Sequence, residues 1–319
     1  MFRKLLVALA LTPWLMVSVN AQQAWPQRNV RFVVAFAPAG PADVVARIVA
    51  QPLQDRWGQS VIVENRGGGG GNIGAQTVSR AEPDGYTILV TTSAFPVNLT
   101  LYDKPGYALS DFSAAAYVAT TPNILVRSPN LKQTTLPDIV AAAKTENLSY
   151  SSAGVGTTTQ LAGELMLRIL GHADVRHVPF TGAAPAANAV MSGQVPLAML
   201  TVSSAGPFIK SGLLKGVAIT TAQRSADLPD VPTVEESGLG KVEAATDIFF
   251  FMPAKTPDAV VEKFNADMNA LIKSGSLDKA FAAAGVTPVT PDRAAAGAYV
   301  ASEVRKWGDV IRAAGVKPE

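Results

Sequence analysis

The segment Val30-Arg-Phe-Val-Val-Ala-Phe-Ala-Pro-Ala-Gly-Pro-Ala-Asp43 runs from an apolar stretch through small residues into a helix start. A continuous apolar run of this kind is typical of a strand buried on both faces of a parallel sheet. A second segment, Ser151-Ser-Ala-Gly-Val-Gly-Thr-Thr158, repeats the same strand–loop–helix order much later in the chain. Two such units, far apart in sequence, predict two lobes that each present a loop to a shared cleft.

Apolar runs and helical spacing alternate along the rest of the chain, which is typical of α/β architecture. The run Phe249-Phe-Phe251 predicts a further buried strand, and Pro52 predicts that the first helix ends or kinks near Gln51. Strands are expected at 30–36, 61–63, 86–92, 124–126, 148–151, 175–178, 195–200 and 216–219, and helices at 137–144, 158–170, 183–191, 260–273, 277–284 and 292–314. We assign 25–123 with 246–319 to lobe 1 and 124–245 to lobe 2.

The first 21 residues have the pattern of a secretory signal peptide. Arg3 and Lys4 precede an apolar run, and Val19-Asn-Ala21 supplies the small residues of a cleavage site. The run is too short for a good membrane span. We therefore expect residues 1–21 to be removed and the mature protein to work in the periplasm.

Composition excludes several classes of function. Without Arg3 and Lys4, the 27 basic residues become 25, equal to the 25 acidic ones, so no charge excess points to nucleic acid. The chain has no cysteine, which removes thiol catalysis and zinc–thiolate sites. It has two histidines, His172 and His177, so a histidine-rich metal site is excluded, and no G-x-S-x-G elbow appears. We expect no catalytic residue and no metal.

The glycine run Gly67–Gly71 is the most conspicuous motif of the chain. Gly69-Gly-Gly-Asn-Ile-Gly74 formally fits the dinucleotide pattern G-x-G-x-x-G. Five consecutive glycines match almost any glycine pattern, however, and the next strand lacks the acidic residue that binds ribose. The sequence therefore predicts no nucleotide or other cofactor.

The two small-residue loops are candidates for anion binding. A helix N-terminus carries unpaired amides and a partial positive charge, so it attracts anions without a charged side chain. The alternative is that both loops are ordinary turns between strand and helix, with Asp43 as a simple helix-start residue. The expected donors are Ala39, Gly40, Ala42 and Asp43 in the first loop and Ser152, Gly154, Gly156, Thr157 and Thr158 in the second.

The motifs and their order resemble the substrate-binding proteins of tripartite tricarboxylate transporters, the TctC-like Bug family. The similarity spans the mature chain, including Val63-Glu-Asn-Arg-Gly-Gly-Gly-Gly-Gly-Asn-Ile-Gly-Ala75, Pro83-Asp-Gly-Tyr86, His177-Val-Pro-Phe180 and Leu228-Pro-Asp-Val-Pro-Thr-Val-Glu235. The resemblance implies a two-lobed type II periplasmic binding protein fold with a central ligand cleft. It also implies a monomer that binds a small organic carboxylate, a di- or tricarboxylate or an aromatic acid, and delivers it to permease subunits in the membrane.

The resemblance further implies that the two loops hold a carboxylate of the ligand, partly through water. From it we also expect the cleft to include Phe36, Ser93, Phe180, Thr201 and Asp247. Asp247 stands where the family usually has Trp, and acids frequent near the second lobe are absent, which disfavours a ligand that carries an ammonium group. The identity of the ligand is therefore not carried over.

Three alternatives remain open at this point. The same closed form could be presented to a sensor kinase of a two-component system, or the permease could be encoded elsewhere or lost. The third alternative is an exported hydrolase, which would have to use His177 as its base. The spacing of residues in the sequence does not identify the other members of a catalytic triad.

Overall fold

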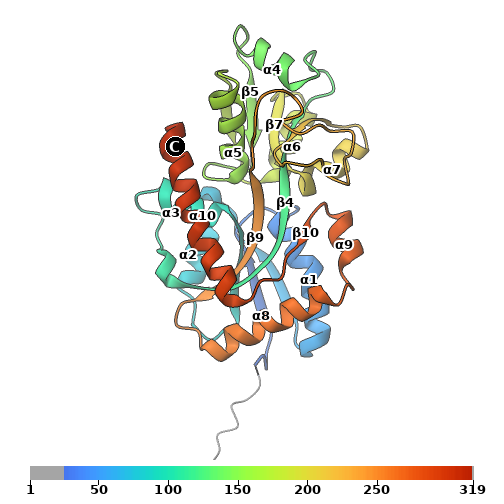
Figure 1. The fold of residues 1–319 in the computed structure, drawn as a ribbon. Coiled ribbons are helices and arrows are strands. Elements are labelled where there is room, and N and C mark those ends of the chain that lie inside the picture. Colours follow the sequence, from blue (N-terminus) through green and yellow to red (C-terminus); the bar gives the residue numbers. More distant parts are fainter. Residues whose placement is uncertain (1–24, 318–319) are drawn as a thin grey trace, which may run out of the picture.

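The computed structural model describes residues 25–317, so the predicted signal peptide at 1–21 lies outside the described residues. Figure 1 shows two lobes joined by the long strands β4 and β9, with α10 running alongside both. The first part of the chain forms β1 (Val30–Val34), α1 (Pro41–Trp57), β2 (Val61–Asn65), η1 (Gly69–Gly71), α2 (Asn72–Ser79), β3 (Thr87–Thr92), α3 (Ala94–Leu101), η2 (Leu109–Asp111) and β4 (Phe112–Arg127).

The middle and the end of the chain continue the alternation of strands and helices. The middle forms α4 (Leu136–Ala142), β5 (Ser149–Ser152), α5 (Thr158–Gly163), the π-helix η3 (Glu164–Leu170), β6 (Arg176–Pro179), α6 (Ala183–Met191), β7 (Leu197–Thr201), α7 (Val202–Lys210) and β8 (Lys215–Ile219). The end forms β9 (Ala245–Pro253), α8 (Asp258–Lys273), α9 (Asp278–Ala283), β10 (Thr287–Pro288) and α10 (Arg293–Ala314).

Strand β4 belongs to both lobes. Its residues 112–122 pair antiparallel with β9, next to the parallel strands β3, β1 and β2 of the first sheet. Its residues 123–127 pair with β7 and β8 in the second sheet, where β7, β5 and β6 run parallel. The change of partner at Pro122 and Asn123 supports the proposed lobe limit at residue 123.

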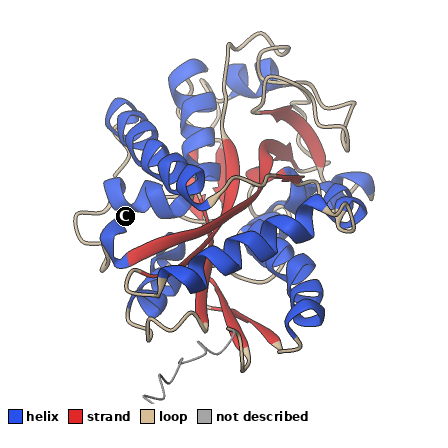
Figure 2. Cartoon of the chain, turned by 60° about the horizontal axis from the view of Figure 1, so that its bottom comes forward, coloured by secondary structure: helices blue, strands red, loops and turns tan. Residues whose placement is uncertain are grey.

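The cores follow the same division. Val30, Phe32, Val33, Val34 and Phe249–Phe251 are buried in the first lobe, as expected for strands covered by helices on both faces, an arrangement visible in Figure 2. The C-terminal helix α10 joins the lobes, because Val300 packs into the core of the first lobe and Trp307 into that of the second.

Two local predictions differ from the structure. Helix α1 continues through Pro52 to Trp57, because Leu53 beyond the proline is buried in the core and holds the last turn in place. The predicted helix 158–170 changes at Glu164 into a π-helix. Helices α2, α3 and α7 were not predicted, since each spans only eight or nine residues, too few to show a helical period clearly.

Candidate ligand-binding site

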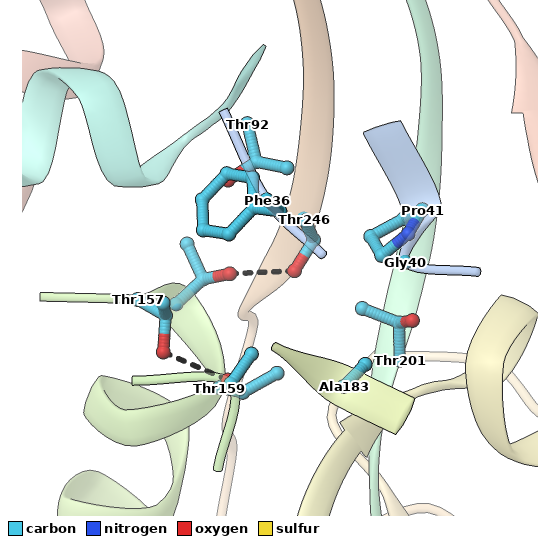
Figure 3. A pocket seen from close by; sticks show the side chains of 11 residues that line it. Phe36, Gly40, Pro41, Thr92, Thr157, Thr159, Ala183, Thr201 and Thr246 are labelled. Carbon is cyan, nitrogen blue, oxygen red and sulfur yellow. Dashed lines mark hydrogen bonds between the residues drawn. The ribbon is translucent and has the colours of Figure 1, made fainter. Parts of the chain in front are cut away.

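A space between the lobes, the inner cavity, is narrow: the centre of a water molecule can occupy about 20 Å3 of it. Figure 3 shows side chains from both lobes pointing into it. No charged side chain is among these lining residues, and six of them are threonines. The lining consists of Phe36, Gly40, Pro41, Thr92, Ala153, Thr157, Thr158, Thr159, Ala183, Thr201 and Thr246.

Four helices begin at the wall of the inner cavity. Helix α1 of the first lobe starts beside Gly40, and helices α5, α6 and α7 of the second lobe start beside Thr157, Ala183 and Thr201. The first amides of a helix have no partner within the helix, and the helix dipole adds partial positive charge. An uncharged wall that gathers helix N-termini from both lobes therefore favours a small anion.

Most hydroxyl hydrogens of the lining threonines are already engaged. Thr246 donates to Asn123 at 2.7 Å, so the 2.5 Å contact between Thr158 and Thr246 takes its hydrogen from Thr158. Thr92 differs, because its oxygen accepts from the amide of Ala94 at 3.2 Å and its hydrogen has no acceptor among residues 25–317. Thr92 is therefore a hydroxyl donor available to a ligand.

The first loop is fixed by the carboxylate of Asp43. One oxygen accepts from the amide of Ala39 at 2.9 Å, and the carboxylate also accepts from Arg47 at 3.1 Å and from Asn65 at 2.9 Å. Burial acts to raise the pKa of Asp43, but the hydrogen bonds from Arg47, Ala39 and Asn65 hold that pKa below its usual value. The predicted amide donor Ala39 is thus used inside the loop, and Gly40 and Pro41 are the residues after it that line the inner cavity.

The second loop is fixed in the same manner by Gln160. The amide of Gly156 donates to the side-chain oxygen of Gln160 at 2.8 Å, which corrects the prediction that Gly156 donates to a ligand. The hydroxyl of Thr157 caps α5 by accepting from the amide of Gln160, and it donates to the carbonyl of Gly154 at 2.7 Å. Thr157 and Thr158 line the inner cavity, as expected from the sequence.

Ser152 and His177 form a pair that superficially resembles a nucleophile and its base. The Ser152 Oγ lies 2.7 Å from His177 Nε2, and the other ring nitrogen faces the Gln160 amide at 3.3 Å. Burial lowers the pKa of His177 to about 4. Ser152 is fully buried and lies outside the lining of the inner cavity, and an amide stands where a triad has a carboxylate. Ser152 is therefore a structural residue behind the loop, which corrects its assignment as a ligand donor.

Ser93 and Asp247 lie behind the cavity wall, which corrects their assignment as cleft residues. The Asp247 carboxylate accepts from the hydroxyls of Ser93 at 3.0 Å, Tyr117 at 2.9 Å and Tyr299 at 3.0 Å. Burial and then the charge of Asp247 raise the pKa of Tyr117, so these hydroxyls remain donors. The neighbours Thr92 and Thr246 face the cavity instead, because successive residues of a strand point to opposite faces.

A wider hollow, the outer groove, adjoins the inner cavity and shares Phe36 and Ala153 with it. It is wider than the inner cavity, since the centre of a water molecule can occupy about 440 Å3 of it. The predicted residues Gly154 and Phe180 lie here rather than in the inner cavity. The groove is lined by Phe36, Gly68, Gly69, Gly70, Gly71, Tyr102, Ala153, Gly154, Val155, Pro179, Phe180 and Thr181.

The predicted site residues thus divide into three groups. The inner cavity is lined by Phe36, Gly40, Thr157, Thr158 and Thr201, and the outer groove by Gly154 and Phe180. Seven others do not line either hollow: Ala39, Ala42, Asp43, Ser93, Ser152, Gly156 and Asp247. The lining residues not predicted are small or singly polar, and only the fold identifies them: Pro41, Thr92, Ala153, Thr159, Ala183 and Thr246.

Residues 25–317 lack two features that would point to other kinds of function. Within that range, no group of three or more His, Cys, Asp or Glu side chains is placed to hold a metal ion. None of the helices in the same range combines the length and the apolar character needed to cross a bilayer.

Comparison with known proteins extends over nearly the whole chain. The family model described as "Tripartite tricarboxylate transporter family receptor" matches residues 45–316. Protein BugT of Bordetella pertussis is 33% identical over 300 residues, which cover 92% of this chain and 91% of BugT. These matches confirm the family predicted from the sequence motifs.

Two solved structures with bound acids are similar in fold. An R. palustris protein with adipate has a TM-score of 0.89 at 30% identity, covering 93% of this chain and 100% of that chain. MatC from Rhodopseudomonas palustris with bound malate has a TM-score of 0.85 at 28% identity, covering 90% of this chain and 100% of that chain. The predicted α/β fold of two lobes is confirmed. The chain belongs to the family of tripartite tricarboxylate transporter receptors.

Proposed function

We propose that the protein is a periplasmic receptor that closes its two lobes over a small organic carboxylate and delivers it to the membrane permease of a tripartite tricarboxylate transporter. The observation that carries this proposal is the inner cavity, where four helix N-termini from both lobes meet and no lining side chain is charged. The signal-peptide pattern at 1–21 supports export to the periplasm.

The ligand carboxylate is held by amides and one hydroxyl from both lobes. In the first lobe the donors are Gly40, the first turn of α1 and the Thr92 hydroxyl, and in the second lobe they are the amides at Thr158 and Thr159. Hydrogen bonds to a charged group contribute about 1.5–3 kcal/mol each, so a few of them allow micromolar binding after ordering costs. Because both lobes contribute, a ligand favours the closed form that a permease can distinguish.

We expect Ser152 and His177 not to react with the bound ligand. Ser152 is buried behind the second loop, His177 is half-buried, and neither residue lines the inner cavity. A bound acid is therefore expected to leave the protein unchanged.

Calorimetric titration with a panel of short organic acids tests the proposal. Thr92→Val should weaken the tightest-binding acid about tenfold to a hundredfold, because it removes one charge-assisted hydrogen bond. Thr87→Val is the matched control, since Thr87 lies at the opposite end of the same strand β3 and outside both hollows. Failure of the folded protein to bind any carboxylate, or an equal effect of both substitutions, would contradict the proposal.

A further inference from the structure

The outer groove is a continuation of the inner cavity. The two spaces share Phe36 and Ala153, so a ligand held in the inner cavity passes the ring of Phe36 to reach the groove. Two contacts between the lobes lie beside the groove. At one of them Gly70 faces the carbonyl of Val155, and at the other a Cβ on Gly182 would lie 2.8 Å from the Cβ of Ala37. The groove is therefore formed when the lobes approach each other.

The lining of the outer groove has no charged side chain. It presents the rings of Phe36, Tyr102 and Phe180 together with the glycine backbone of residues 68–71. A carboxylate placed there would meet no cationic side chain. An aromatic or other apolar group would gain from burial and from contact with the rings.

The glycine run gives the groove its shape. Gly68–Gly71 all have positive φ, between +56° and +132°, a conformation that other residues rarely adopt. A Cβ on Gly71 would lie 3.1 Å from Cζ of Phe36, so the ring of Phe36 rests directly on this glycine. The glycine run thus forms a wall without side chains, which leaves room between the lobes.

We propose that the outer groove is a subsite for the uncharged distal part of the ligand, so that the preferred ligands are monocarboxylates with an aromatic or bulky apolar tail. This inference rests on the proposed function, because it requires the carboxylate to be held in the inner cavity. It adds that the second end of the ligand is recognised by apolar contact, not by a second anion site.

Three probe acids separate this inference from the proposed function. Adipate and 5-phenylpentanoate have the same methylene spacer and differ only in ending with a carboxylate or a phenyl ring, while butanoate is shorter and carries neither end group. In calorimetric titrations of the whole protein, 5-phenylpentanoate should bind at least about tenfold more tightly than either of the others. Tighter binding of adipate would overturn the inference and leave the proposed function intact. Failure of the folded protein to bind all three would overturn both.

Substitutions in the groove locate the effect. Phe180→Ala should remove most of the advantage of 5-phenylpentanoate and leave butanoate unchanged. Thr181→Trp, at an exposed lining position, should fill the groove and likewise remove most of the advantage of 5-phenylpentanoate. Phe208→Ala is the matched control, because Phe208 is half-buried against the same apolar cluster as Phe180 but lies outside the groove. Equal losses for all acids with Phe180→Ala, or equal effects of Phe180→Ala and Phe208→Ala, would overturn the inference.

Discussion

The first loop (36–43) and the second loop (152–158) are both held in shape by a side chain from the helix that follows, but the two side chains differ. In each, the amide of the residue before the N-cap donates to the side chain at the third helical position, from Ala39 to Asp43 and from Gly156 to Gln160. In both loops this side chain closes the turn, and the N-cap residues Gly40 and Thr157 line the inner cavity. The cavity is therefore lined by two similar turns with different chemistry.

The difference lies in charge and in connection to the rest of the lobe. Asp43 is an anion held by Arg47 and Asn65, whereas Gln160 is neutral and contacts the ring of His177. The shape of the first loop is stabilised by a buried carboxylate whose charge Arg47 compensates. The shape of the second loop is stabilised by hydrogen bonds between neutral groups, Gly156, Gln160 and His177. A buried negative charge near an anion site is tolerable because Arg47 compensates it, while the second lobe avoids the charge altogether.

Acid should affect the second loop before the first, and this is the largest expected effect. The unfolded imidazole titrates near pH 6.5, whereas burial lowers the pKa of His177 to about 4. The contribution of His177 to the free energy of unfolding is fully present above pH 6.5. It is lost as the pH falls toward 4, because over this range the unfolded chain binds a proton at His177 and the folded chain does not. The loss approaches about 3 kcal/mol.

Urea unfolding of the wild type and of His177→Asn at a series of pH values measures this loss. The wild type should lose stability between pH 6.5 and 4, and the variant should show a flatter profile over that range. Asp43 behaves differently, since its pKa lies below its unfolded value of 3.8 and its contribution is lost only as the pH falls below that value. Parallel profiles for wild type and variant would show that His177 is not the titrating group.

The two loops were predictable from the sequence because small residues followed by a helix start form a local signal. The sequence did not predict whether a given side chain at a strand end points into the cavity or away from it. Ser93 and Thr92, like Asp247 and Thr246, are adjacent polar residues at strand ends, and a shift of one residue exchanges the cavity face for the buried face. The role of Gln160 also requires the folded turn, because its partner is a backbone amide rather than a residue type.

Replacing Asp43 should lower the free energy of unfolding more than replacing Gln160, because the Asp43 side chain is charged and that of Gln160 is neutral. Asp43→Ala leaves the amide of Ala39 and the side chain of Asn65 without their acceptor, so it should lower the free energy of unfolding by about 2 kcal/mol at neutral pH. Gln160→Ala removes a neutral hydrogen bond and should cost about 1 kcal/mol. Asp43→Asn, which keeps an acceptor but removes the charge, is the control. Urea unfolding measures all three, and a larger loss for Gln160→Ala than for Asp43→Ala would contradict the comparison.

Exchanging the residues before the two N-caps tests the smallest difference. Both adopt positive φ, +63° at Ala39 and +77° at Gly156. Ala39→Gly relieves a conformation unfavourable for alanine, and after the entropy cost of glycine it should stabilise the protein by less than about 1 kcal/mol. Gly156→Ala directs a methyl group at the Oδ1 of Asn98 across the interface between the lobes, so it should oppose closure and weaken ligand binding about tenfold. Adding Asn98→Ala to Gly156→Ala removes the obstacle and should restore part of the affinity in a calorimetric titration. If Gly156→Ala binds as tightly as the wild type, the contact between Gly156 and α3 is not part of the ligand-bound form.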